Sequence, residues 1–153
     1  MNPPLREDDE CWLVLDTDHH LEGPHRANLI ETILEAEKDD VHVALSCPCF
    51  EFWLLLHHMD EFQAQAASNC DEIQTLIRSS VGEYNKTNLK REHYGAGSAV
   101  DATVRAERLD GGVPGGHLPE THTTRIYKLI RAIAAKGLPS DLPAELRNLS
   151  PVR

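Results

Sequence analysis

Two short apolar runs, separated by one amphipathic pattern, open the chain. Residues 11–16 (CWLVLD) are apolar up to a terminal aspartate, as in a strand that is buried on both faces. Residues 26–40 place Leu29 and Ile33 on one helical stripe, with acidic residues opposite. Residues 41–46 (VHVALS) predict a second strand. Strand, helix and strand in this order are typical of a right-handed βαβ unit, so we expect a small parallel sheet flanked by helices in an α/β fold.

The remainder of the chain predicts helices joined by polar segments. Pro48 is acceptable in the first turn of a helix, and Gly137 is a suitable helix stop. Residues 82–97 are polar and glycine-flanked, which favours an irregular segment. Helical patterns cover four further stretches: residues 48–58, 71–80, 98–110 and 123–136.

Length and composition indicate one domain. The chain has 153 residues, of which 41% are hydrophobic, enough for a core of its own. We expect an acidic N-terminal segment over residues 1–10, a compact domain over 11–137 and a proline-rich tail over 138–153. No apolar run is long enough to span a bilayer and residues 1–10 do not resemble a secretory signal, which favours the cytoplasm and no membrane partner. The four cysteines are accordingly expected to be reduced thiols.

Charge is distributed unevenly along the chain. The net charge is −10, but residues 1–77 hold 3 Lys/Arg and 17 Asp/Glu, whereas residues 78–153 hold 12 and 8. An acidic half facing a basic half would suit a metal site beside a phosphate-binding surface, although folding can mix the halves in space. A chain of this net charge should bind free nucleic acid weakly, which favours dependence on a metal and on a partner.

The Asp16-Thr17-Asp18 motif is the main candidate for chemistry. Side chains alternate along a strand, so both carboxylates should project together from its carboxyl end, where open α/β sheets bind ligands. A hard cation relieves the repulsion between them, and Mg²⁺ prefers one or two carboxylates with water and phosphate. We therefore expect Asp16 and Asp18 to bind Mg²⁺ or Mn²⁺. The alternative is a solvated loop that caps the following helix.

Histidines and one acidic residue are secondary candidates. His19 and His20 follow the aspartates directly, but exposed loop positions explain them equally well. Glu51 stands in the apolar run CFEFWLLLHH, where a buried carboxylate needs a partner or a metal. His57 lies further along the same predicted helix. Glu51 and His57 are candidate catalytic residues, or polar groups satisfied within the core.

Basic residues suggest where a phosphate could bind. Tyr84, Lys86 and Lys90 lie in the irregular segment, and basic groups interleaved with aromatics suit a phosphate backbone and unstacked bases. A solvated surface is an equally good explanation of this segment. Arg125, Lys128 and Arg131 recur every three residues, and for them we expect a solvated helix face.

With these residues identified, the chain resembles the RloB family of bacterial proteins. The resemblance rests on WLVLDTDHH (12–20), ALSCPCFEFWLLLHH (44–58), EYNK (83–86) and TTRIYKLI (123–130), in the family's order. The family is similar to toprim-like nucleases of restriction and phage-defence (abortive-infection) loci, often beside an ATPase gene. The resemblance implies a compact toprim-like domain that cleaves nucleic-acid phosphodiesters, DNA or RNA, with Mg²⁺ or Mn²⁺.

The resemblance also assigns residues and leaves alternatives open. Asp16 and Asp18 match the family's metal ligands, while Glu51, His57 and Lys86 match motif positions without an assigned role. Relatives usually begin with an earlier strand that ends in glutamate, and we expect this chain to lack it. An inactive module that binds an ATPase or a second copy is the main alternative, because a missing strand leaves a sheet edge open. A phosphoesterase acting on small molecules is a third reading.

Overall fold

The predicted βαβ unit is confirmed. The computed structural model describes residues 6–113, 115–119 and 121–149, apart from the side chains of His19 and His20. Strand β1 (Cys11–Asp16) leads through a 3₁₀ turn, η1 (Asp18–Leu21), into helix α1 (Gly23–Lys38), and strand β2 (Val41–Cys47) follows. β1 and β2 pair in parallel, with Cys11 opposite Val41 and Asp16 opposite Ser46. The carboxyl ends of both strands therefore meet at one edge of the sheet.

A third strand makes the sheet mixed. β3 (Thr123–Thr124) pairs antiparallel with the end of β2, in the order β1-β2-β3. The sequence pattern placed these two threonines in a helix, but α6 (Ile126–Lys136) begins only after them. The hydroxyl groups of Ser46 and Thr124 lie 2.8 Å apart, so a buried hydrogen bond joins the two strands as well as the backbone. Pairing with β2 thus overrides the local helical preference.

The four further predicted helices are present in the expected order with altered limits, whereas α3, η2 and α7 were not predicted. α2 ends at Leu55 instead of continuing to His58, so its last predicted turn is wrong. α4 begins at a true cap, since Asn69 Oδ1 accepts the Glu72 N–H at 3.0 Å, and it ends at Gly82 in the left-handed region (φ 84°). The elements are α2 (Glu51–Leu55), α3 (Glu61–Ala64), α4 (Cys70–Val81), η2 (Arg91–His93), α5 (Ala96–Gly111), α6 and α7 (Ala144–Arg147).

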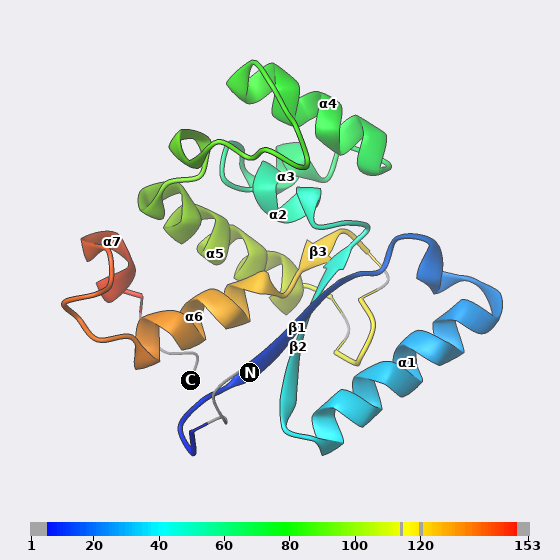
Figure 1. Cartoon of the computed structure of the whole chain (residues 1–153). Coiled ribbons are helices and arrows are strands. Elements are labelled where there is room, and N and C mark those ends of the chain that lie inside the picture. Colours follow the sequence, from blue (N-terminus) through cyan, green and yellow to red (C-terminus); the bar gives the residue numbers. More distant parts are fainter. Residues whose placement is uncertain (1–5, 114, 120, 150–153) are drawn as a thin grey trace.

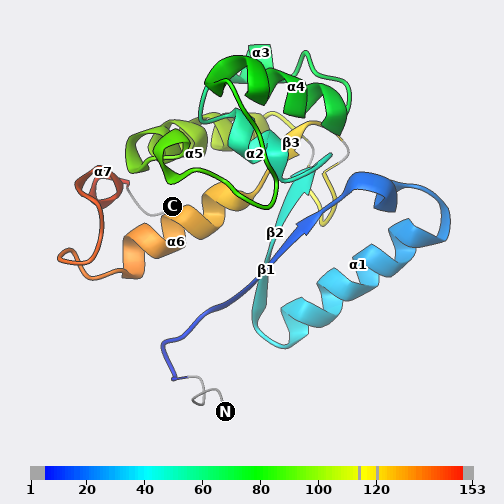
Figure 2. The same ribbon diagram turned by 45° about the horizontal axis from the view of Figure 1, so that its top comes forward.

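Helices cover both faces of the sheet. α1 lies on one face and α5 and α6 on the other, while α2, α3 and α4 gather beyond the carboxyl ends of β1 and β2 (Figures 1 and 2). Val43 and Leu45 pack against α1, whereas Ala44, between them, joins the larger core on the opposite face. This alternation explains the continuous apolar run, because every second residue serves a different core. None of the described helices is long and apolar enough to cross a membrane.

The cysteines depart from expectation. Cys49, just before α2, and Cys70, the first residue of α4, form a disulfide, with their Cα atoms 6.2 Å apart. Cys11 and Cys47 are free thiols. The expectation of reduced thiols is therefore wrong for Cys49 and Cys70. Residues 21 positions apart in sequence meet because α4 packs on α2, a proximity that spacing alone does not reveal.

Candidate functional site

The loop that follows β1 positions the two aspartates. β1 ends at Asp16, and Thr17 takes a helical backbone conformation (φ −83°, ψ −22°), so strand alternation does not extend to Asp18. The loop is tied instead to the segment after β2. Thr17 N–H donates to the Ser46 carbonyl at 2.9 Å, and Asp18 N–H donates to the Pro48 carbonyl at 2.7 Å. Asp16 and Asp18 face the same cavity, as expected, but the turn at Thr17 brings them together instead of strand alternation.

Both aspartates line a polar cavity of about 370 Å³ at the carboxyl ends of the parallel strands. Other walls come from the start of α2, the first turns of α4 with the residues just before it, and the irregular segment that contains Lys86. Among the lining residues Lys86 supplies the positive charge. We call this cavity the carboxylate pocket; its lining residues are Asp16, Asp18, Pro48, Cys49, Glu51, Ser68, Asn69, Cys70, Asp71, Gln74 and Lys86.

Burial and nearby negative charge both oppose the ionisation of Asp16. Burial raises the pKa of the Asp16 carboxyl above its ordinary value, and the negative charge of Glu51 raises it further, with a smaller contribution from Asp18. The backbone N–H of Phe50 donates to this carboxyl and, with the charge of Lys86, opposes the rise. The folded protein therefore holds an ionised Asp16 at an energetic cost at neutral pH.

Glu51 is held by three polar neighbours. Its side chain is buried (2% exposed), and its Oε1 accepts the Tyr84 hydroxyl at 2.8 Å and Gln74 Nε2 at 3.4 Å. Lys86 Nζ lies 3.7 Å from the same oxygen. Burial and this hydrogen bond raise the pKa of the Tyr84 hydroxyl, so Tyr84 remains a hydrogen-bond donor. Tyr84 and Lys86, both from the EYNK segment, thus meet Glu51 at the wall of the pocket.

The donor set suits a hard divalent cation. Asp16, Asp18 and Glu51 offer carboxylate oxygens, the ligands that Mg²⁺ prefers. Among the described residues no group of three or more His, Cys, Asp and Glu side chains is arranged to enclose an ion. Mg²⁺ does not require such a group, since it keeps several waters and binds through one or two carboxylates. Asp16 and Asp18 would hold the ion, with Glu51 beside them.

Asp16→Asn is expected to stabilise the protein in the absence of divalent cations. Because the folded-state pKa of Asp16 is raised, the cost is absent at low pH, grows as pH rises through the unfolded value near 3.8 and is complete above the folded value. At neutral pH the variant should therefore melt at a higher temperature than the wild type.

Thermal melts with and without MgCl₂ test this expectation. Mg²⁺ should raise the Tm of the wild type and leave that of Asp16→Asn unchanged. Glu31→Gln, which removes an exposed carboxylate of α1 outside the pocket, serves as the charge-matched control. A lower Tm for Asp16→Asn than for this control would contradict the repulsion.

Two of the candidate residues lie elsewhere. His57 does not line the pocket; its Nδ1–H donates to the Trp53 carbonyl at 3.0 Å, and its ring meets Tyr94 edge-on. Burial lowers the pKa of His57 to about 4, so the imidazole is neutral. Lys90 pairs with Glu83 instead of facing the pocket. The side chains of His19 and His20 lie outside the described part of the chain.

Sequence reasoning missed the wall that α4 provides. Gln74 reaches Glu51 from this helix, and Asn69 and Asp71 line the pocket beside it. Cys70 and Gln74 are four residues apart and therefore share a helix face, which was the available signal. Nothing in the local sequence, however, shows that this face turns toward β1.

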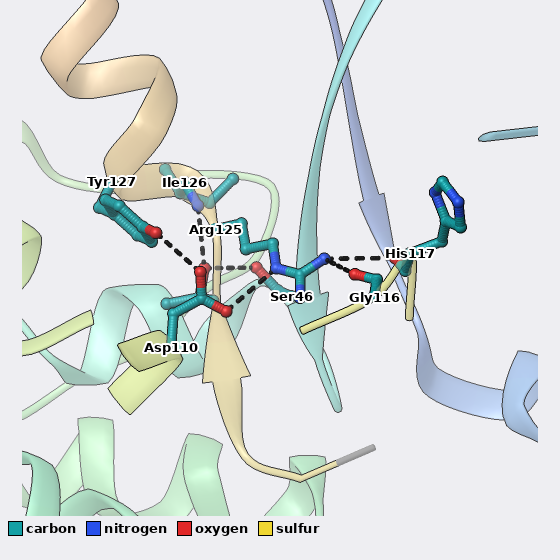
Figure 3. Close-up of polar contacts among 8 residues, drawn as sticks. Ser46, Asp110, Gly116, His117, Arg125, Ile126 and Tyr127 are labelled. Carbon is teal, nitrogen blue, oxygen red and sulfur yellow. Dashed lines mark hydrogen bonds and ion pairs between the residues drawn. The ribbon is translucent and has the colours of Figure 1, made fainter. Parts of the chain in front are cut away.

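The expectation of a solvated helix face is wrong at Arg125. Its side chain is buried, and its Nε donates to Asp110 Oδ1 at 3.1 Å, while Nη1 donates to the carbonyls of Gly116 (2.7 Å) and His117 (3.3 Å). The Tyr127 hydroxyl donates to the other oxygen of Asp110 at 2.7 Å. Figure 3 shows the guanidinium between Asp110 on one side and the two carbonyls on the other. Arg125 thus connects β3, α5 and the glycine-rich segment, outside the carboxylate pocket.

Comparison with known proteins identifies the family. The model of the RloB-like protein family matches residues 2–133, which include every segment on which the resemblance rests. Searches of curated proteins and of solved structures find no match to the chain. The match spans most of the chain and covers both strands of the βαβ unit and the lining of the carboxylate pocket. The chain belongs to the RloB-like family.

Proposed function

We propose that the chain is a Mg²⁺- or Mn²⁺-dependent nuclease domain of a bacterial phage-defence system, which cleaves phosphodiester bonds at the carboxylate pocket. The observation that carries the proposal is the convergence of Asp16, Asp18 and Glu51 on one cavity with Lys86 in its wall. Family membership supports it, because the RloB family resembles toprim-like nucleases. The defence role rests on that resemblance alone.

The residues divide into two groups by charge. Asp16 and Asp18 would bind the metal, and a cation would offset the cost of ionising Asp16, which arises from burial and from the charge of Glu51. A bound Mg²⁺ supplies an activated water and a counter-charge for the phosphate. Lys86, 72% exposed at its side chain, can meet a phosphate oxygen from the other side of the pocket. Tyr84 and Gln74 keep Glu51 in a fixed orientation beside the reacting groups.

Cleavage assays test this function directly. Purified protein is incubated with single- and double-stranded DNA, single- and double-stranded RNA and transfer RNA, in MgCl₂, in MnCl₂ and in EDTA. We expect cleavage of at least one substrate that depends on the metal and falls to the EDTA level in Asp16→Asn and in Asp18→Asn.

Glu31→Gln should retain full activity, because this exposed carboxylate lies on α1 outside the pocket. Lys86→Ala should weaken substrate binding more than it changes the metal requirement. Equal activity in the wild type and in both aspartate variants would refute the proposal. Phage infection of cells that carry the wild-type gene or the Asp16→Asn variant tests the defence role separately.

A second candidate function is an interaction module without catalysis, which binds a partner ATPase or another copy. One observation favours it: in the described part of the chain β1 pairs with β2 alone, so its outer edge presents unpaired backbone groups, and Val14 on it is 41% exposed. The same assays separate the two functions. A folded protein that cleaves none of these substrates in either metal would favour the interaction module.

A further inference from the structure

The Cys49–Cys70 disulfide joins two walls of the carboxylate pocket. Both cysteines line the cavity together with Asp16, Asp18 and Glu51. The free cysteines, Cys11 and Cys47, do not. The bond therefore lies where a change in its state would alter the pocket.

One half of the bond belongs to the rigid side of the pocket. Cys49 is 3% exposed and follows Pro48, whose carbonyl accepts the Asp18 N–H at 2.7 Å. Two residues later comes Glu51, and the intervening Phe50 donates its N–H to Asp16. A displacement of Cys49 would therefore be transmitted to all three carboxylates. The hydrogen bond between Pro48 and the loop after β1 holds this side of the pocket against the sheet.

The other half belongs to α4. Cys70 is its first residue and only half-buried, and Gln74, one turn later, donates to Glu51. Deeper in the helix, Ile73 and Ile77 are fully buried against α2. Without the disulfide these apolar contacts would still hold α4 in place, and the first turn would lose its covalent attachment. Reduction should therefore loosen the pocket wall without unfolding the domain.

We propose that Cys49 and Cys70 form a reversible thiol–disulfide site that controls how firmly the first turn of α4 closes the carboxylate pocket. In the oxidised form the α4 wall is joined to the segment between β2 and α2 that leads into Glu51. In the reduced form the segment from Ser68 to Glu72, which precedes the buried Ile73, opens more often. The consequence for metal binding rests on the proposed function, whereas the bond and its effect on α4 do not.

The oxidation balances with a small-molecule disulfide as the oxidant. The more accessible thiol, Cys70, loses its proton and attacks that disulfide, which forms a mixed disulfide and releases one small thiol. Cys49 then loses its proton, attacks the Cys70 sulfur and releases the second small thiol. The protein loses two protons and two electrons, and the oxidant is reduced to two thiols. Reduction reverses these exchanges.

Peptide mapping and hydrogen exchange on the full chain test the proposal. Treatment with oxidised glutathione should give a Cys49–Cys70 linked peptide, and dithiothreitol should remove it. Amide exchange within residues 68–72 should be at least about threefold faster in the reduced protein, while exchange in β1 and β2 stays the same. In Cys49→Ser/Cys70→Ser this segment should exchange as in the reduced wild type and ignore the redox treatment.

Cys11→Ser keeps the pair and should respond as the wild type does. Absence of the linked peptide, linkage of Cys70 to a different cysteine, a stable glutathione adduct, or equal exchange in both redox states would each overturn the proposal.

Mn²⁺ titration separates this inference from the proposed function. If the pocket binds metal, affinity should fall several-fold on reduction, since a loosened wall is less preorganised. Binding that is absent in both redox states would count against the nuclease function, while the exchange experiment would still decide the role of the cysteines. If Mn²⁺ binds with equal affinity in both redox states although amide exchange differs, the disulfide affects only the mobility of the first turn of α4. That result would overturn its control of metal binding.

Discussion

Arg125→Met is expected to lower the free energy of unfolding by about 3–5 kcal/mol, because it leaves a carboxylate without its ionic partner inside the protein. Asp110 is paired with Arg125 at 3.1 Å, and both side chains are 11% exposed. The variant would also leave the carbonyls of Gly116 and His117 without their guanidinium donor. Methionine keeps much of the volume, so the loss should reflect charge and hydrogen bonding.

Urea unfolding of a double-mutant cycle checks the origin of this loss. Asp110→Asn removes the uncompensated charge. The Arg125→Met/Asp110→Asn protein should therefore lose less unfolding free energy than the sum of the losses in the two single variants. Arg125→Lys should be intermediate, since an ammonium group cannot reproduce the guanidinium fork toward Asp110 and the carbonyls. Strictly additive losses, or an Arg125→Met protein within about 0.5 kcal/mol of wild type, would contradict a coupled buried pair.

Acidification should destabilise the protein through His57. Burial lowers its folded-state pKa to about 4 from 6.5, so folding favours the neutral imidazole. The stability contributed by this shift is therefore complete above pH 6.5 and is lost as pH falls toward 4, where the loss approaches about 3 kcal/mol. The unfolded chain binds the proton that the folded core excludes.

The contribution of His57 is isolated by comparing two variants in urea unfolding between neutral pH and pH about 4. His57→Gln keeps a donor for the Trp53 carbonyl and removes the titration, so its stability should fall less steeply than that of the wild type. His42→Gln, at an exposed position of β2, should follow the wild-type profile. Identical slopes for wild type and His57→Gln would show that His57 titrates normally.

The carboxylate pocket was foreseeable where it depends on strand ends and motifs. Asp16 terminates an apolar strand, and the carboxyl ends of parallel strands meet, so an acidic pocket at this edge of the sheet follows from the pattern. Glu51 stood out because an acid in an apolar run must find partners. Those partners, Tyr84 and Gln74, lie 33 and 23 residues away, a separation across which local pattern carries no information.

His57 and Lys90 were predicted to contribute to the site, but neither lines the carboxylate pocket. Both are close in sequence to pocket residues, but His57 faces Trp53 and Tyr94, and Lys90 pairs with Glu83. α2 ends at Leu55, so it does not continue to His57 as the sequence pattern predicted. Neighbours in sequence diverge because a turn redirects the side chains once the helix ends.

The sequence by itself determined the βαβ unit, the order of the helices and the acidic end of β1. These features depend on short-range periodicity, which a few consecutive residues express. Only the tertiary structure decided that β3 pairs with β2, that Arg125 is buried against Asp110, and that Cys70 and Gln74 reach the pocket from α4. Such contacts join distant segments, and their partners are selected by how helices pack over the sheet, which no local pattern encodes.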